Sequence, residues 1–150
     1  MRHCDKDEAY SETHCTEKGA RRAAWLPSLF DGDRFEPPSY LYARKPEKPR
    51  NVMRSIETLE PMSRTFGLDI DVHFGEQDNE KLAEDVKRHL TSEGPVVVAW
   101  KHLRLPSLAK ALGMEKPGTW EADDFDSMYV LTFDGDKLVS SKKEQEGYAE

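Results

Sequence analysis

Apolar residues recur at helical spacing in four segments of the chain. The first segment follows Thr16, whose side chain can cap a helix, and it ends before Pro27. Its stripe comprises Ala20, Ala23, Ala24 and Leu26. The second follows Asn51, a residue suited to the N-cap, and Gly67 is its predicted stop. Its stripe comprises Val52, Ile56, Leu59, Ser63 and Phe66. Pro61 removes one interior hydrogen bond, which predicts a kink or break there.

Two further helices are predicted in the second half. One is capped by Asn79 and ends before Gly94, and the other is closed by Gly113. Their apolar stripes are Leu82, Val86 and Leu90, and then Leu105, Leu108, Ala109 and Leu112. Residues 44–50 hold two prolines among basic side chains, which predicts an exposed loop.

The apolar runs between the helical segments predict strands. Residues 40–43 form a short β-prone run, and residues 68–72 alternate apolar and acidic side chains, as in a strand near a sheet edge. Residues 95–100 are apolar in succession, which is typical of a central parallel strand. Residues 128–133 and 137–140 flank a turn and predict a hairpin at the sheet edge.

This order of elements predicts one α/β domain spanning residues 1–150. Strands separated by helices pair in parallel, and the helices cover the sheet. We therefore expect a three-layer α/β/α sandwich with a mostly parallel sheet and an antiparallel edge hairpin. Residues 142–150 are charged and are expected to form a frayed tail.

Composition narrows the possible partners and the cellular location. Charged residues make up 34% of the chain and the formal net charge is -7, which disfavours binding to nucleic acid. No apolar stretch is long enough for a membrane span. The polar first residues lack the apolar centre of an export signal, which predicts a cytoplasmic protein whose two cysteines are reduced thiols.

The candidate chemistry lies at the ends of predicted elements. His102 follows the strongest strand, and ligands of parallel sheets bind beyond the carboxyl ends of strands. Arg54 falls in the opening turn of its helix, where free N–H groups and the helix dipole favour an anion. Arg2 and His3 add an arginine and an imidazole from a third segment. Together the four side chains predict a phosphate pocket.

Three short motifs carry a resemblance to a known family. Arg2-His3-Cys4, Arg54-Ser55-Ile56-Glu57-Thr58 and the run from Val96 to His102 occur in the order of the signatures of the histidine phosphatase superfamily, which has the phosphoglycerate-mutase-like fold. In that family an Arg-His-Gly signature supplies the phosphate-accepting histidine. The resemblance implies a phosphomonoester hydrolase without metal or other cofactor, acting on a phosphorylated small molecule or a phosphoprotein.

The resemblance also implies a role for each residue. His3 attacks phosphorus and forms a transient phosphohistidine, while Arg2, Arg54 and His102 hold the phosphate oxygens. Glu76 is the first candidate for the acid that protonates the leaving alcohol, and Asp78 is the second. Arg44 in the basic loop is a candidate contact for the rest of an anionic substrate.

The chain departs from the family pattern at its beginning. Family members have an apolar strand directly before the signature, and here only Met1 precedes Arg2, so this strand is expected to be missing. Cys4 stands where the signature has glycine. An exposed strand beside the missing one is a possible route to dimers by edge pairing.

Two alternative functions remain open. One is a phosphate-binding or interaction domain of the same fold with weakened catalysis. The other is a zinc site, because His3-Cys4 and His14-Cys15 offer four nitrogen and sulfur ligands, although their spacing fits no usual zinc pattern.

Overall fold

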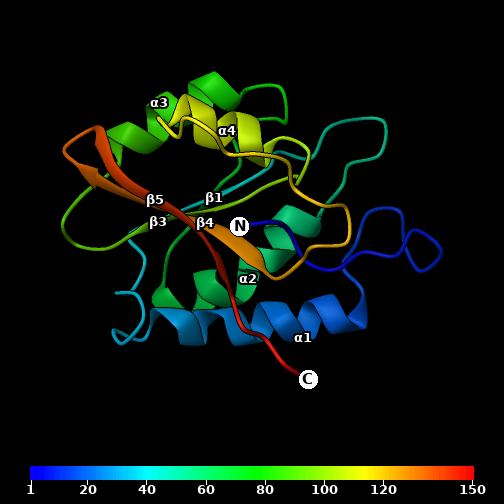
Figure 1. The fold of residues 1–150 in the computed structure, drawn as a ribbon. Coiled ribbons are helices and arrows are strands. Elements are labelled where there is room, and N and C mark those ends of the chain that lie inside the picture. Colours follow the sequence, from blue (N-terminus) through cyan, green and yellow to red (C-terminus); the bar gives the residue numbers. More distant parts are fainter.

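The computed structural model describes residues 1–150 and contains both helices and strands (Figure 1). The helices are α1 (Glu17–Trp25), the 3-10 helix η1 (Leu26–Phe30), α2 (Arg54–Phe66), α3 (Asn79–Arg88) and α4 (Leu105–Ala111). The strands are β1 (Tyr40–Ala43), β2 (Ile70–Asp71), β3 (Val96–Ala99), β4 (Ser127–Asp134) and β5 (Lys137–Gln145). The α/β class predicted from the sequence is confirmed.

A small parallel sheet has the order β2-β1-β3. Residues 40–43 form β1, as the sequence predicts, and β1 lies in the middle of this sheet. In the register of β1 with β3, Tyr40 is opposite Val96 and Ala43 is opposite Ala99. The prediction that the strand near residues 68–72 lies at an edge is also confirmed, although this strand is only two residues long.

Two separate apolar clusters cover the opposite faces of this sheet. Leu41 and Ala43 of β1 pack with η1 and α2, whereas Tyr42 between them packs with α3 and α4. Successive side chains of a strand point to opposite faces, so this alternation places helices on both sides. Figure 1 shows α1 and α2 on one side of the strands and α3 and α4 on the other.

Strands β4 and β5 pair only with each other, in antiparallel fashion. The prediction that this hairpin forms the edge of the parallel sheet was therefore wrong. On the side of β3 that faces away from β1, the first residues of the chain, and not the hairpin, bond to the backbone at the end of the strand. Arg2 forms a parallel bridge with Trp100, and the backbone N–H of His3 donates to the Trp100 carbonyl oxygen at 3.1 Å.

The prediction of a frayed tail over residues 142–150 was wrong for residues 142–146. Strand β5 continues to Gln145, and Glu146 is only 1% exposed. Arg22 of α1 donates from Nε and Nη2 to the Glu146 carboxylate, both at 2.7 Å. Ala20 and Ala24 of the apolar stripe are exposed, because α1 turns Gly19, Arg22 and Ala23 inward to meet this carboxylate and the first residues of the chain.

The predicted helix starts require corrections. Helix α2 begins after Met53 and not after Asn51, because Asn51 has a left-handed backbone with φ of 51°. Helix α3 is preceded by Asp78, so Asn79 is its first residue and not its cap. Pro61 does not break α2, since the fully buried Leu59 and Met62 hold both halves of the helix against one core.

Candidate functional site

His3 lies buried at the point where the first residues of the chain meet the carboxyl end of β3. Its side chain is held by a hydrogen bond of 2.8 Å between Nδ1 and the Cys4 carbonyl oxygen. A carbonyl oxygen only accepts, so Nδ1 carries the proton and Nε2 has the free lone pair. Burial, together with the positive charges of Arg2, Arg54 and Arg44, lowers the pKa of His3 to about 3. The imidazole is therefore neutral at pH 7.

Arg2 is fully buried beside His3. Its Nη1 donates to the carbonyl oxygens of Ala122 and Asp124, at 2.7 and 3.1 Å, and its guanidinium lies 3.6 Å from the centre of the Phe125 ring. The buried Nε and Nη2 atoms have no hydrogen-bond partner. Unsatisfied charged donors are costly in a protein interior, so this half of the guanidinium is suited to an anionic ligand.

Arg54 opens α2 and is 3% exposed. Its Nε donates to the His14 carbonyl oxygen at 3.1 Å and its Nη2 to that of Ser11 at 2.9 Å. The helix is joined to the histidine segment by Thr58, whose hydroxyl accepts from the Cys4 N–H at 2.6 Å and donates to the Arg54 carbonyl oxygen at 2.7 Å. These bonds fix the first turn of α2 beside His3.

His102 follows β3 and is 8% exposed. Its Nδ1 is buried without a hydrogen-bond partner. Burial, with the charges of Arg2, Lys6 and Lys101, lowers the pKa of His102 to about 4. The charge of Arg2 thus lowers the pKa of both histidines, and atoms of Arg2 and His102 are among the buried polar groups that have no hydrogen-bond partner.

Glu76 and Arg44 lie at the border of the same region. The positive charge of Arg44 contributes to lowering the pKa of both His3 and Glu76. Glu76 forms ion pairs with Lys101 Nζ at 3.0 Å and with Arg104 Nε at 3.6 Å. Burial raises the pKa of Glu76, but these cations outweigh it and leave the pKa below its usual value. A general acid needs a raised pKa, because its carboxyl must be protonated near neutral pH to donate a proton.

Asp78, the second candidate acid, has a local structural role. Its Oδ2 accepts a hydrogen bond of 2.9 Å from the backbone N–H of Gly75, and its backbone precedes α3. No hydrogen bond or ion pair joins Asp78 to His3 or His102. The carboxylate therefore closes the turn at residues 75–78.

The sequence reasoning missed the segment that covers Arg2. Residues 122–125 supply both carbonyl acceptors of Arg2, and the Phe125 ring lies 6.2 Å from the His3 ring, centre to centre. The residue types at these positions do not indicate that their backbone carbonyl oxygens accept hydrogen bonds from an arginine. The adjacent acidic pair Asp123-Asp124 is the one local signal, since both carboxylates raise the pKa of Arg2 and partly offset the effect of burial, which lowers it to about 10.

Cys4 and Cys15 form a disulfide, so the prediction of two reduced thiols was wrong. Both residues are anchored on the first turns of α2: Cys4 through Thr58, and Cys15 through its N–H, which donates to Glu57 at 2.9 Å. A disulfide between residues 11 positions apart restricts the unfolded chain, which stabilises the folded state by about 2–4 kcal/mol.

The alternative zinc site does not form, because the two sulfurs are bonded to each other and no group of three or more potential ligands lies together.

The buried neutral histidines make stability depend on pH. In the unfolded chain these imidazoles protonate near 6.5, whereas in the folded protein His102 protonates near 4. The unfolded state binds more protons between these values, so the contribution of His102 to stability is complete above pH 6.5 and is lost as the pH falls towards 4. We expect His102→Gln to reduce the slope of unfolding free energy against pH, in urea titrations between pH 6 and 4.5, by up to about 1.4 kcal/mol per pH unit. An unchanged slope would show that His102 protonates normally in the folded protein.

Compared with known proteins, the chain matches no family model and no curated protein. None of its helices is both long and apolar enough to cross a membrane.

Proposed function

We propose that this chain is a histidine-phosphatase-like domain that hydrolyses a phosphomonoester through a phosphohistidine on His3. The observation that carries the proposal is the neutral, oriented imidazole of His3, together with buried Arg2 and His102, each of which has at least one polar atom without a protein partner. The helix layers on both faces of the parallel sheet agree with the three-layer α/β/α sandwich that this family implies, and we include that fold in the proposal.

His3 is the nucleophile in this mechanism. The hydrogen bond from Nδ1 to the Cys4 carbonyl fixes the tautomer, so the lone pair on Nε2 attacks phosphorus in line as the bond to the leaving oxygen breaks. The proton on Nδ1 stays on the ring, and the Cys4 carbonyl supports the positive charge that develops there. Water then attacks the phosphohistidine, which releases inorganic phosphate and restores the neutral ring.

The phosphate oxygens are held by groups from three segments. Arg2 offers Nε and Nη2, the two adjacent donors of one guanidinium edge, and His102 offers Nδ1. Arg54 uses Nε and Nη2 on backbone carbonyls, which leaves Nη1 for a phosphate oxygen. Fork-shaped, charge-assisted hydrogen bonds suit the equatorial oxygens of a transferring phosphoryl group. In this proposal Arg44 contacts the anionic remainder of a phosphorylated small molecule or phosphoprotein.

Glu76 is the acid of this mechanism only when its ion pairs are weakened. A phosphate dianion entering beside Lys101 and Arg44 competes for the same cations and raises the pKa of the Glu76 carboxyl. Its proton then goes to the leaving alkoxide oxygen. A phenolate or similar leaving group needs no such proton, and its hydrolysis depends on the other residues alone.

The experiment measures hydrolysis of p-nitrophenyl phosphate in buffer with a metal chelator. We expect turnover by the wild-type protein and a loss of about a hundredfold or more in kcat/KM for Arg54→Gln, because one charged donor to the transferring phosphoryl group is removed. The matched control is Arg64→Gln, an exposed arginine in the last turn of the same helix, which should leave kcat/KM unchanged. No turnover by the wild type would defeat the enzyme proposal.

The lowered pKa of Glu76 favours a second candidate, a phosphate-binding domain with weakened catalysis. Calorimetric titration with inorganic phosphate distinguishes the two. Binding that Arg54→Gln weakens, without turnover of the ester, identifies the binding domain. Absence of both binding and turnover removes both candidates.

A further inference from the structure

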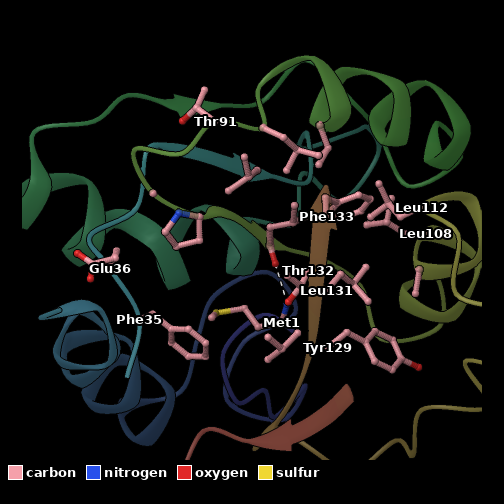
Figure 2. A pocket seen from close by; sticks show the side chains of 18 of the residues that line it. Met1, Phe35, Glu36, Thr91, Leu108, Leu112, Tyr129, Leu131, Thr132 and Phe133 are labelled. Atoms are coloured by element: carbon pink, nitrogen blue, oxygen red, sulfur yellow. Dashed lines mark hydrogen bonds between the residues drawn. The ribbon is translucent and has the colours of Figure 1, made fainter. Parts of the chain in front are cut away.

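Two features of the molecule lie outside the proposed mechanism. One is an open groove of about 740 Å³ between β3 and β4, whose lining is mostly apolar and includes Leu131 and Phe133 (Figure 2). None of the residues proposed to hold phosphate lines this groove. The other is the disulfide between Cys4 and Cys15, whose sulfurs lie 3.6 and 3.8 Å from the Arg54 carbonyl oxygen. The disulfide is therefore the feature that contacts the proposed site.

The disulfide closes a loop, residues 6–14, in which no residue is buried. Every hydrogen bond and ion pair between this loop and the rest of the chain goes to residues 50–57, the segment that opens α2. Across the base of the loop, the Thr16 N–H donates to the Asp5 carbonyl oxygen at 3.0 Å. Segments with few buried contacts have low local stability, so the covalent bond has a large share in holding the loop in place.

The loop positions the guanidinium group of Arg54. The His14 carbonyl oxygen accepts from Nε at 3.1 Å, and the Ser11 carbonyl oxygen accepts from Nη2 at 2.9 Å. Because the guanidinium is planar, these two bonds set the direction of Nη1, the atom that the proposed mechanism gives to phosphate. Lys6, in the same loop, is one of the charges that lower the pKa of His102. Displacement of the loop therefore takes the support of Arg54 and one cation away from the site.

The two halves of the disulfide differ in their surroundings. Cys4 is fully buried, and its N–H is bonded to Thr58 Oγ1 at 2.6 Å. Helix α1 packs so closely here that a Cβ on Gly19 would lie 2.8 Å from the Asp5 carbonyl oxygen and 3.1 Å from the Cys4 Cβ. Cys15 is partly exposed. A reductant therefore approaches the disulfide at Cys15, and Cys4 stays in place after the bond is broken.

We propose that the disulfide between Cys4 and Cys15 is a redox switch of the proposed phosphate site: a dithiol reductant opens it, the loop of residues 6–14 relaxes, and Arg54 loses its position. A thiolate of the dithiol attacks Cys15 Sγ and expels Cys4 as a thiolate, which takes up a proton. The second thiol then attacks the reductant's own sulfur in the mixed disulfide, which forms a disulfide within the reductant and releases the Cys15 thiol. Two electrons and two protons pass to the protein. The effect on phosphate chemistry rests on the proposed function.

The first test measures the position of Arg54 and does not depend on activity. The native chain, oxidised or reduced with dithiothreitol that is then removed, is treated with phenylglyoxal, which modifies accessible guanidinium groups, and peptide mass spectrometry follows each arginine. Reduction should accelerate labelling of Arg54 by at least about tenfold and leave Arg22 unchanged, because Arg22 is equally buried but is held by Glu146.

Three results of this labelling experiment overturn the proposal. One is labelling of Arg54 that reduction does not change. Another is equal acceleration at Arg54 and Arg22, which would show that the disulfide holds the whole fold and not the loop. The third is a disulfide that dithiothreitol does not reduce in the native protein.

Turnover of p-nitrophenyl phosphate separates the switch from the proposed function. Reduction should lower kcat/KM by at least about tenfold, and reoxidation should restore it, because a charged donor to the phosphoryl group is displaced and then returned. The control for the reductant is Cys15→Ser, which should have the low kcat/KM of the reduced wild type and should not respond to dithiothreitol. Equal kcat/KM of the oxidised and reduced wild type overturns the switch and leaves the enzyme proposal standing. Faster labelling of Arg54 after reduction, without turnover in either form, supports redox opening of the loop and defeats the enzyme proposal.

Discussion

Replacement of His3 by glutamine is expected to reduce kcat for p-nitrophenyl phosphate by at least about a thousandfold. Glutamine keeps a polar side chain of similar reach but has no nucleophilic lone pair on a ring nitrogen. The proposed phosphohistidine therefore cannot form, whatever the affinity for substrate. Steady-state kinetics at pH 7 measure the change, and circular dichroism establishes that the variant is folded.

His73→Gln is the matched control, because this histidine is exposed and bonds only to Asp71. It should retain wild-type kcat. A phosphoryl group on His3 should also be detectable by mass spectrometry after rapid alkaline quench of the wild type, and should be absent from His3→Gln. If His3→Gln keeps more than a tenth of wild-type kcat, another residue is the nucleophile and the mechanism proposed here is wrong.

Replacement of Arg22 by alanine is expected to lower the free energy of unfolding by about 3–5 kcal/mol. The variant leaves the Glu146 carboxylate in the core without its two hydrogen bonds from the guanidinium. Asp5 loses its neighbouring cation as well, since its Oδ2 lies 3.6 Å from Arg22 Nη1. Urea unfolding at pH 7 measures the loss.

The control for Arg22→Ala lies next to it in α1. Arg21 pairs with Glu150 at the surface, where both side chains are about half exposed, so Arg21→Ala should cost about 1 kcal/mol or less. The double variant Arg22→Met with Glu146→Leu should recover most of the lost stability, because apolar residues of similar size can replace a buried ion pair. Equal losses of unfolding free energy in Arg21→Ala and Arg22→Ala would show that the buried ion pair contributes no more to stability than the surface pair.

The positions of most helices and strands could be predicted from sequence patterns that extend over a few residues. Residues 40–43 become β1 because β-prone side chains stand between turn residues, and Thr16 caps α1 by accepting from the Gly19 N–H at 3.0 Å. Both features depend on residues a few positions apart. The pairing of the hairpin could not be obtained in this way, since nothing within β4 or β5 indicates which sheet edge, if any, they join.

The candidate site also has features that the sequence predicts and features that it does not. Residue types and their order pointed to His3, Arg54 and His102. The contacts of Arg2 with the carbonyls of residues 122 and 124 could not be predicted, because backbone oxygens are the same in every sequence. The ion pairs that lower the pKa of Glu76 depend on how the loop at residues 75–78 lies against Lys101, which no spacing along the chain reveals.

By itself the sequence determined the α/β class, most of the helices and strands, and which segments carry imidazole and guanidinium groups, because periodicity and turn chemistry act over a few residues. Only the tertiary structure decided that Arg22 is buried against Glu146, that Cys4 bonds to Cys15, and that β3 and β4 flank an open groove. Each of these depends on groups brought together from distant parts of the chain. The free energy of such contacts depends on distance in space and burial, and neither can be read from neighbouring residues.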